Sequence, residues 1–150
     1  EGDPLPLPHL DSERNRLRGG GYLHLEALLS TERMRREGDE PVRLSRGNLR
    51  WMYWTPAQML AHHASNGCDL RPGDLLASGT VSGPDADSRG CLLELTSGGK
   101  QPVQLPNGEE RRFLEDGDEL ILRGHCEREG AVRLGFGECR GVVESARIAR

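Results

Sequence analysis

Two short stretches of the sequence carry the side chains best suited to chemistry. The first, Ser78 to Pro84, reads SGTVSGP and brings hydroxyls, including that of Thr80, close to glycine N–H groups. Such groups at the end of a strand make a concavity that can hold a carboxylate or phosphate oxygen. The second stretch holds one carboxylate, Glu94, among leucines, and a carboxylate in buried apolar surroundings is a candidate acid–base residue.

Each stretch also has an interpretation that involves no ligand. Glycine-rich turns are far commoner than anion sites, which favours an ordinary turn at residues 78–84. Simple alternation would direct Leu93 and Leu95 toward the core and Glu94 toward water, where acidic residues usually lie. A buried Glu94 would need a His or Arg partner, or its pKa would rise. The residues alone leave both pairs of interpretations open.

One helix is clearly specified among the elements that must position these residues. Thr55-Pro56-Ala57-Gln58 supplies an N-cap hydroxyl, a proline at the first helical position and a glutamine that can close a capping box. Asn66-Gly67 tolerates the left-handed conformation that ends helices. The sequence therefore predicts a helix at about residues 55–66.

The rest of the chain has the composition of strands and turns, which predicts a mainly β (α+β) fold. Residues 1–20 are expected to form an extended loop leading into the domain. Residues 22–29 are expected to form an edge strand continuing toward Met34, with a short helix as the alternative, and the aromatic cluster at 51–54 an anchor strand. Further strands are predicted at 75–80, 91–96, 102–105, 119–123, 132–136 and 139–143, with a hairpin turn at Asn107-Gly108.

Two other polar clusters are less suited to binding. His62 and His63 point about 100° apart on a helix, so they cannot chelate one ion together, and one of them is expected to cap the helix or to pack near the interior. Asp116, Asp118 and Glu119 lack the spacing of a calcium loop, so they are expected to form an acidic turn before a strand. Common protease, nucleotide and zinc motifs are absent from the sequence.

Composition narrows the class of protein further. The 150 residues carry a net charge of −4 with arginines spread among acids, which argues against a nucleic-acid partner. Apolar runs are only a few residues long, so no membrane span is expected. The four cysteines are far apart, which favours a reducing, cytoplasmic location. Because no Met precedes Glu1, the true amino terminus is expected to lie elsewhere.

Longer motifs resemble one known family. They are YWTPAQMLAHHASNGC at residues 53–68, LRPGDLLASGTVSGP at 70–84, LLEL at 92–95, FLEDGDE at 113–119 and GFGEC at 135–139. Together they resemble the fumarylacetoacetate hydrolase family, and within it the fumarylacetoacetases, from about Trp51 to Val143. The resemblance implies that residues 1–150 are the carboxy-terminal portion of a catalytic domain whose amino-terminal part is missing, on a fold described as a mixed β-sandwich roll.

The resemblance also implies an activity and site residues. Members hydrolyse 4-fumarylacetoacetate, a β-diketone, to fumarate and acetoacetate at the end of tyrosine and phenylalanine catabolism, as homodimers with Mg²⁺ or Ca²⁺. A Glu–His dyad activates the water. By this resemblance Glu94 matches the catalytic glutamate and Thr80 the residue that binds a substrate carboxylate.

The chain departs from the family pattern in one respect. The dyad histidine, the metal ligands and the cationic substrate residues are all expected upstream of Glu1, so these 150 residues alone are expected to be inactive and to hold no metal. Two alternatives stay open at this point: a non-catalytic module that binds a dicarboxylate or a protein partner, and a hydrolase of another acylpyruvate or β-keto acid.

Overall fold

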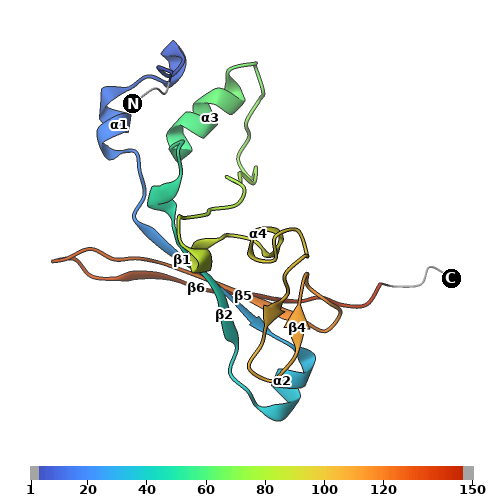
Figure 1. The fold of residues 1–150 in the computed structure, drawn as a ribbon. Coiled ribbons are helices and arrows are strands. Elements are labelled where there is room, and N and C mark those ends of the chain that lie inside the picture. Colours follow the sequence, from blue (N-terminus) through green and yellow to red (C-terminus); the bar gives the residue numbers. More distant parts are fainter. Residues whose placement is uncertain (1–3, 147–150) are drawn as a thin grey trace.

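The chain is built around one antiparallel sheet. The computed structural model describes residues 4–146, in which four strands pair in the order β2-β1-β5-β6 and two shorter strands form a separate hairpin (Figure 1). The strands are β1 (Leu23–Ser30), β2 (Val42–Asn48), β3 (Val103–Gln104), β4 (Glu110–Arg111), β5 (Glu119–Cys126) and β6 (Leu134–Val142). The predicted mainly β, α+β class is confirmed.

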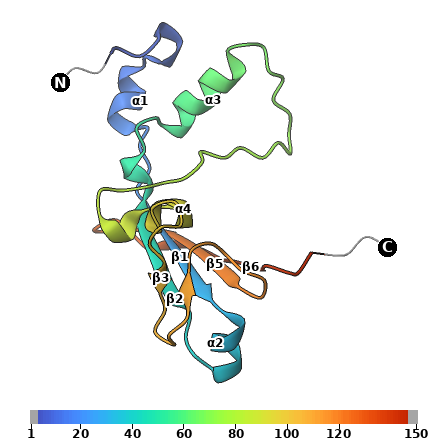
Figure 2. The same cartoon turned by 45° about the vertical axis from the view of Figure 1, so that its right-hand side comes forward.

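The helices are short, and three of the four lie beyond the ends of the sheet. They are α1 (Glu13–Arg18), α2 (Glu32–Glu37), α3 (Pro56–Ala64) and α4 (Leu92–Leu95), with 3-10 turns at Pro8–Leu10, Leu49–Trp51 and Ala86–Ser88. Figures 1 and 2 show α1 and α3 beyond one end of the sheet and α2 beyond the other. No helix among residues 4–146 has both the length and the apolar character needed to cross a membrane.

The predicted helix at 55–66 is confirmed as α3. The Thr55 hydroxyl accepts a hydrogen bond from the Gln58 N–H at 3.1 Å, and the Gln58 side chain accepts one from the Thr55 N–H at 3.0 Å. This is the predicted capping box, with Pro56 in the first turn. Gly67 follows the helix with φ of 86°, a conformation that glycine adopts at little cost.

Strand β1 was predicted correctly as a strand, but its predicted place at the edge is wrong. It pairs with β2 on one side and with β5 on the other, so it lies in the interior of the sheet. It also ends at Ser30 instead of continuing toward Met34. The next residue, Thr31, caps α2 by accepting a hydrogen bond from the Met34 N–H at 3.1 Å, which turns the chain into a helix.

The carboxy-terminal half follows the prediction more closely. The predicted hairpin at Asn107-Gly108 joins β3 and β4, with Val103 opposite Arg111. The predicted strand at 119–123 extends to Cys126 as β5. The two strands predicted at 132–136 and 139–143 are one strand, β6, which is bent against β5 by a register shift instead of being broken.

Several other local predictions are wrong. Residues 4–20 of the predicted extended loop contain a 3-10 turn and α1, whose N-cap Ser12 accepts from the Asn15 N–H; residues 1–3 lie outside the described residues. The aromatic cluster at 51–54 is the end of a 3-10 turn and a bend. Residues 75–80 are irregular and exposed, because they pair with no strand within residues 4–146.

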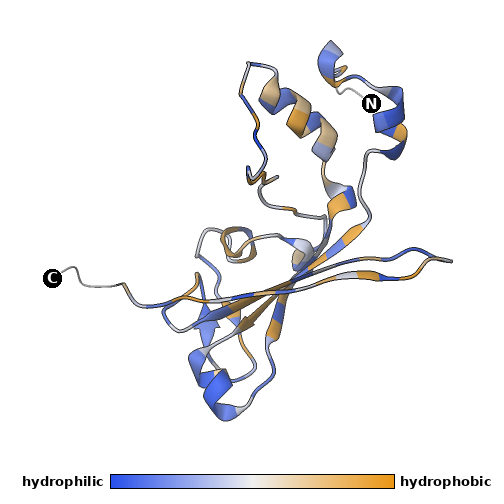
Figure 3. Cartoon of the chain, turned by 180° about the vertical axis from the view of Figure 1, so that it is seen from behind, coloured by the Kyte–Doolittle hydropathy of each residue, from blue (hydrophilic) through white to orange (hydrophobic). Residues whose placement is uncertain are grey.

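The core lies between the sheet, α2 and the β3–β4 hairpin. Its buried centre consists of Leu29, Met34 and Leu105, one residue from each of these three parts. Partly buried apolar residues surround it: Val42, Leu44, Val103 and Leu114. Figure 3 shows apolar residues recurring along the strands and α3, whereas α1 and α2 are mostly hydrophilic, as expected for helices with solvated faces.

A buried ion pair ties the hairpin to the start of β5. The guanidinium of Arg111 donates from Nε to Asp118 Oδ2 at 2.9 Å and from Nη2 to Asp118 Oδ1 at 3.0 Å. Asp118 is fully buried and also accepts from the Glu115 N–H at 2.9 Å. The predicted acidic turn before a strand is thus confirmed, and Asp118 has a structural role within it.

Glu109 extends this network to the N-cap of α2. It accepts from the Thr31 hydroxyl and the Asn107 amide, each at 2.5 Å, and lies 3.4 Å from Arg111 Nη2. The Thr31 hydrogen bond is the main reason that the pKa of Glu109 is lowered, and Asn107 and Arg111 act in the same direction against the effect of burial. The carboxylate is therefore held in its charged form.

The lowered pKa of Glu109 predicts loss of stability in acid. A carboxyl whose pKa is lower folded than unfolded stabilises the fold above its unfolded pKa of about 4.3, and this contribution is lost as the pH falls through the folded value. The unfolding free energy of the protein should therefore fall less steeply below that pH in Glu109→Gln than in wild type. Urea titrations across pH measure this. Glu110→Gln, a change at an exposed neighbour, should follow wild type, and equal slopes for all three proteins would contradict the prediction.

Candidate active site

Glu94 lies on a short helix instead of the predicted strand. It is in the single turn of α4, where the Leu95 N–H donates to the Cys91 carbonyl at 3.0 Å. Glu94 is exposed in the described chain, which contradicts the interpretation that it is buried in a strand. Glu94 Oε2 accepts from the Ser82 hydroxyl at 2.6 Å and from the Gly90 N–H at 3.1 Å. In the described chain, the hydrogen-bond donors to Glu94 are therefore a hydroxyl and a backbone N–H, not a His or Arg side chain.

These hydrogen bonds favour the charged form of Glu94. Its pKa is lowered, chiefly by the Ser82 hydroxyl, with further lowering by the Gly90 N–H and by Cys91, while burial opposes the shift. Glu94 is thus an anion at neutral pH. An anion of this kind can accept a hydrogen bond from an imidazole and stabilise the imidazolium that forms, but it is poorly suited to donate a proton.

The loop that carries Ser82 is fixed by its own hydrogen bonds. The Gly83 N–H donates to the Ser88 carbonyl at 2.9 Å, and the Asp85 N–H donates to the Ser88 hydroxyl at 2.9 Å. Gly83 packs so closely on Trp51 that a Cβ there would lie 2.1 Å from the indole ring. Only glycine fits at this position, so residues 82–88 are held against the segment that follows β2.

Thr80 lies beside the same group of atoms. A Cβ built on Gly90 would come within 2.6 Å of Thr80 Cγ2 and 2.4 Å of the Val81 carbonyl oxygen. The Gly90 N–H also donates to the Ser82 hydroxyl at 3.1 Å. The fold therefore brings together the two predicted site residues, Thr80 and Glu94, around Gly90 and Ser82. Thr80 itself is exposed and lies in an irregular segment, not at the end of the predicted buried strand.

The close approach at Gly90 gives a testable prediction. In Gly90→Ala the added methyl collides with the Val81 carbonyl, so the backbone must move and the contacts of Ser82 and Gly90 with Glu94 lengthen. We expect the activity of the protein at its natural length to fall by at least about tenfold, as for a misplacement of about an ångström in a catalytic site. Gly20→Ala is the matched control, because a Cβ there meets nothing within 4 Å. Equal activity of both variants would count against the prediction.

The two histidines of α3, His62 and His63, lie on the surface. His62 stacks on His9 with ring centroids 5.9 Å apart, and His63 Nε2 lies 3.3 Å from Cys68 Sγ. Both histidines are exposed, which contradicts the alternative that one of them packs near the interior. Gln58, one turn before His62, is the buried residue of α3, and its amide donates to the Leu10 carbonyl at 3.2 Å.

The described residues do not make a site for a hard divalent cation. Within residues 4–146, no group of three or more His, Cys, Asp or Glu side chains is placed to hold a metal ion. Mg²⁺ and Ca²⁺ need several oxygen ligands converging on one point. No step of a reaction through a metal is derived from these residues.

Sequence reasoning missed two members of the group around Glu94. Ser82 was recognised as a hydroxyl that could face an anion, but it was not linked to Glu94, and Gly90 was not singled out. The signal in the sequence was faint, since Ser82 and Gly90 precede Glu94 by 12 and 4 residues. Their convergence depends on the loop closing over Trp51, which no local pattern encodes.

Comparison with known proteins defines the class. Residues 27–144, which include the loop, Thr80 and Glu94, match the model of the family described as "Fumarylacetoacetate (FAA) hydrolase C-terminal". The chain belongs to the fumarylacetoacetate hydrolase family.

The chain is also similar in sequence to individual fumarylacetoacetases. The chain is 47% identical over 143 residues to the fumarylacetoacetase of Bos taurus and 45% identical over 141 residues to that of Homo sapiens, which covers 95% and 94% of this chain. It is 53% identical over 116 residues, 77% of the chain, to the fumarylacetoacetase of Caenorhabditis elegans. The matched part is 32% of the bovine and human proteins and 27% of the nematode protein, so the chain spans about a third of the length of these relatives or less.

Proposed function

We propose that the protein hydrolyses a carbon–carbon bond of 4-fumarylacetoacetate to give fumarate and acetoacetate. The observation that carries the proposal is the similarity to fumarylacetoacetases over nearly the whole chain. In this proposal the chain forms the carboxy-terminal part of the catalytic domain. The protein would then act in tyrosine and phenylalanine catabolism, as a cytoplasmic homodimer.

Glu94 is proposed as the catalytic carboxylate that orients a histidine from outside this chain. As an anion, Glu94 accepts the N–H of that imidazole, so the other ring nitrogen is free to take a proton from water. The water oxygen bonds to the carbonyl carbon of the fumaryl group, and the bond from that carbon to the methylene between the two ketones breaks. Its electron pair passes to the acetoacetate fragment as an enolate, which takes a proton to complete the hydrolysis.

A metal would assist this chemistry from ligands outside residues 4–146. Mg²⁺ or Ca²⁺ would polarise the carbonyl and stabilise negative charge on oxygen. Ser82 and Gly90 both donate to Glu94 Oε2, which leaves Oε1 to accept the N–H of the imidazole. The role of this chain is then to hold a charged carboxylate in a fixed orientation.

Thr80 is proposed to bind a terminal carboxylate of the substrate. Thr80 lies in an exposed segment beside Gly90, where a ligand can approach. In Thr80→Val, which keeps the shape but removes the donor, KM for 4-fumarylacetoacetate should rise about tenfold to a hundredfold, as expected for a lost hydrogen bond to a charged group.

Steady-state kinetics with a matched control tests this assignment. Ser78→Ala removes a nearby hydroxyl that donates to the Gly79 carbonyl at 3.1 Å, and it should leave KM close to wild type. A substrate analogue that lacks the terminal carboxylate should be hydrolysed equally well by wild type and Thr80→Val. If Thr80→Val changed KM for this analogue as much as for the natural substrate, the carboxylate role would be wrong.

The substrate class is tested by comparing rates. The protein at its natural length, with Mg²⁺ or Ca²⁺, should have a far higher kcat/KM for 4-fumarylacetoacetate than for an acylpyruvate. A higher kcat/KM for the acylpyruvate would support a hydrolase, but one that acts on a different substrate. Hydrolysis of neither compound would favour a binding module.

A further inference from the structure

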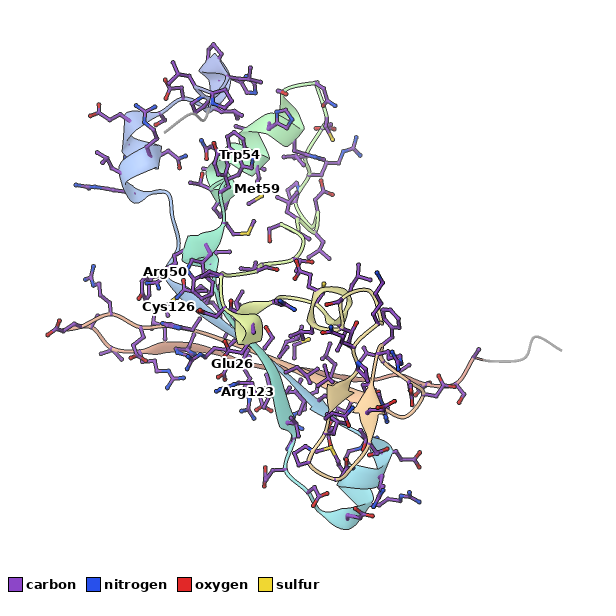
Figure 4. The ribbon with its side chains drawn as sticks, viewed as in Figure 1. Glu26, Arg50, Trp54, Met59, Arg123 and Cys126 are labelled. Atoms are coloured by element: carbon purple, nitrogen blue, oxygen red, sulfur yellow. The ribbon has the colours of Figure 1, made fainter. Side chains whose placement is uncertain are left out.

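Two histidines face each other on neighbouring strands of the sheet. His24 of β1 and His125 of β5 are register partners, so their side chains leave the same face at the same level. Their imidazole rings are stacked, with centroids 4.7 Å apart and planes 10° from parallel. The next pair on this face, Glu26 and Arg123, is labelled in Figure 4, so the end of the face that carries the histidines is polar.

The space next to the histidine pair is open to a small ligand. A hollow of about 430 Å³ is lined by Tyr22, His24, Glu127, Arg128 and Glu129. On the other side of β5, the register partner of His125 is Gly135, and a Cβ at Gly135 would meet nothing within 4 Å. A ligand held by the two rings would therefore have room for water molecules around it.

The charges around the pair favour a cation. Glu127 Oε2 lies 3.8 Å from His125 Nε2, and Glu129 lines the same hollow. The countercharges are Arg128, also in the lining, and Arg133, whose Nε lies 3.9 Å from Glu127 Oε2. Glu127 is on the segment after β5 and more than half exposed, so its carboxylate can turn toward an ion between the rings.

Two imidazoles fixed side by side select a particular class of metal. Neutral imidazole is a good ligand for Zn²⁺, Cu²⁺ and Ni²⁺, whereas Mg²⁺ and Ca²⁺ prefer oxygen. Strand pairing places the two Cα atoms about 4.5–5.5 Å apart, a spacing from which both rings reach one ion after rotating about their Cβ–Cγ bonds. The backbone has already been ordered by the sheet, so binding needs only this side-chain rotation.

We propose that His24 and His125 form a two-imidazole chelate for a divalent transition-metal ion. Water molecules complete the coordination, and Glu127 supplies negative charge nearby. Within the described residues no third His, Cys, Asp or Glu is placed as a ligand, so the site is an open one of moderate affinity. It is independent of the proposed hydrolase function and differs in ligand type from a Mg²⁺ or Ca²⁺ centre.

Copper binding tests the site without any assay of activity. Cu²⁺ is added to the metal-free protein at its natural length, and electron paramagnetic resonance detects the nitrogen ligands. Wild type should show coupling to two imidazole nitrogens. His24→Phe and His125→Phe each keep an aromatic ring against its partner but remove the ligand, so each should weaken Cu²⁺ binding at least about tenfold.

A second stacked pair in the same chain supplies the control. His62→Phe changes the His9–His62 stack, which lies on the exposed end of α3, and it should leave Cu²⁺ affinity and the spectrum unchanged. Wild type also provides a test that needs no variant, because Zn²⁺ should shift the ring proton resonances of His24 and His125 together. Unshifted resonances, or a spectrum unaltered in His24→Phe, would show that the two rings serve only as a packed cross-strand pair.

Discussion

In Glu94→Gln, kcat for 4-fumarylacetoacetate should fall by at least about a hundredfold, at the lower end of what a positioned acid–base group contributes. The amide keeps the shape of the side chain and can still accept a hydrogen bond from Ser82. It carries no charge, so it neither orients the proposed imidazole in the same way nor stabilises its protonated form. Steady-state rates of the protein at its natural length, with Mg²⁺ or Ca²⁺, measure the effect.

A matched change separates loss of charge from loss of fold. Glu110→Gln alters an exposed carboxylate on β4 whose side-chain contact is the amide of Gln104 at 3.0 Å. It should leave kcat unchanged. Both variants should unfold at temperatures close to that of wild type, because Glu94 is exposed in the described chain. A folded Glu94→Gln protein with full activity would exclude the proposed role.

Asp118→Ala is expected to be the most destabilising of the substitutions considered, at about 3–5 kcal/mol. The change leaves the Arg111 guanidinium buried without its main partner, because both Asp118 oxygens now accept from it. The Glu115 N–H loses its acceptor as well. Because Arg111 lies on β4 and Asp118 directly precedes β5, the hairpin should loosen from the sheet. Urea unfolding of the protein measures the loss.

The same turn contains a control for this prediction. Asp116 is an exposed acid two residues earlier, and Asp116→Ala should change stability by no more than about 0.5 kcal/mol. Replacing both buried partners, as in Arg111→Met with Asp118→Leu, should recover much of the loss because no buried charge is left unpaired. A cost below about 1 kcal/mol for Asp118→Ala would contradict the structural role.

Local signals in the sequence were sufficient for part of the fold. The capping box of Thr55 and Gln58 predicted α3, and Asn107-Gly108 predicted the hairpin, because in both cases the chemistry of a few adjacent residues determines the backbone. The position of β1 inside the sheet could not be predicted in this way. Its neighbour β5 lies about 100 residues further along the chain, and its alternating pattern fits an edge or an interior strand equally.

Short apolar runs misled the prediction. The run Leu92–Leu95 was interpreted as a strand but forms α4. A run of only four residues is too short to distinguish the repeat of a helix from the alternation of a strand. Leu75 and Leu76 were interpreted as part of a buried strand, yet Leu75 is 94% exposed. An apolar run becomes a strand only when a partner supplies its backbone hydrogen bonds, and residues 4–146 supply none there.

The roles of the candidate site residues Thr80 and Glu94 stay predictions, and their local geometry was not predictable from the sequence. The motifs around Thr80 and Glu94 singled out both residues through the family resemblance. The hydrogen bonds of Ser82 and Gly90 to Glu94, and the resulting low pKa, come from loop closure on Trp51. Of the two interpretations left open for Glu94, exposure is the one that holds in the described chain, and the strand that would have buried it does not form.

One measurement tests the central claim most directly: formation of fumarate and acetoacetate from 4-fumarylacetoacetate by the protein at its natural length. The proposal predicts that the two products appear in equal amounts as the substrate is consumed, with turnover reduced at least about a hundredfold in Glu94→Gln. Absence of both products from the wild-type protein, under conditions where it is folded and Mg²⁺ or Ca²⁺ is present, would contradict the proposed function.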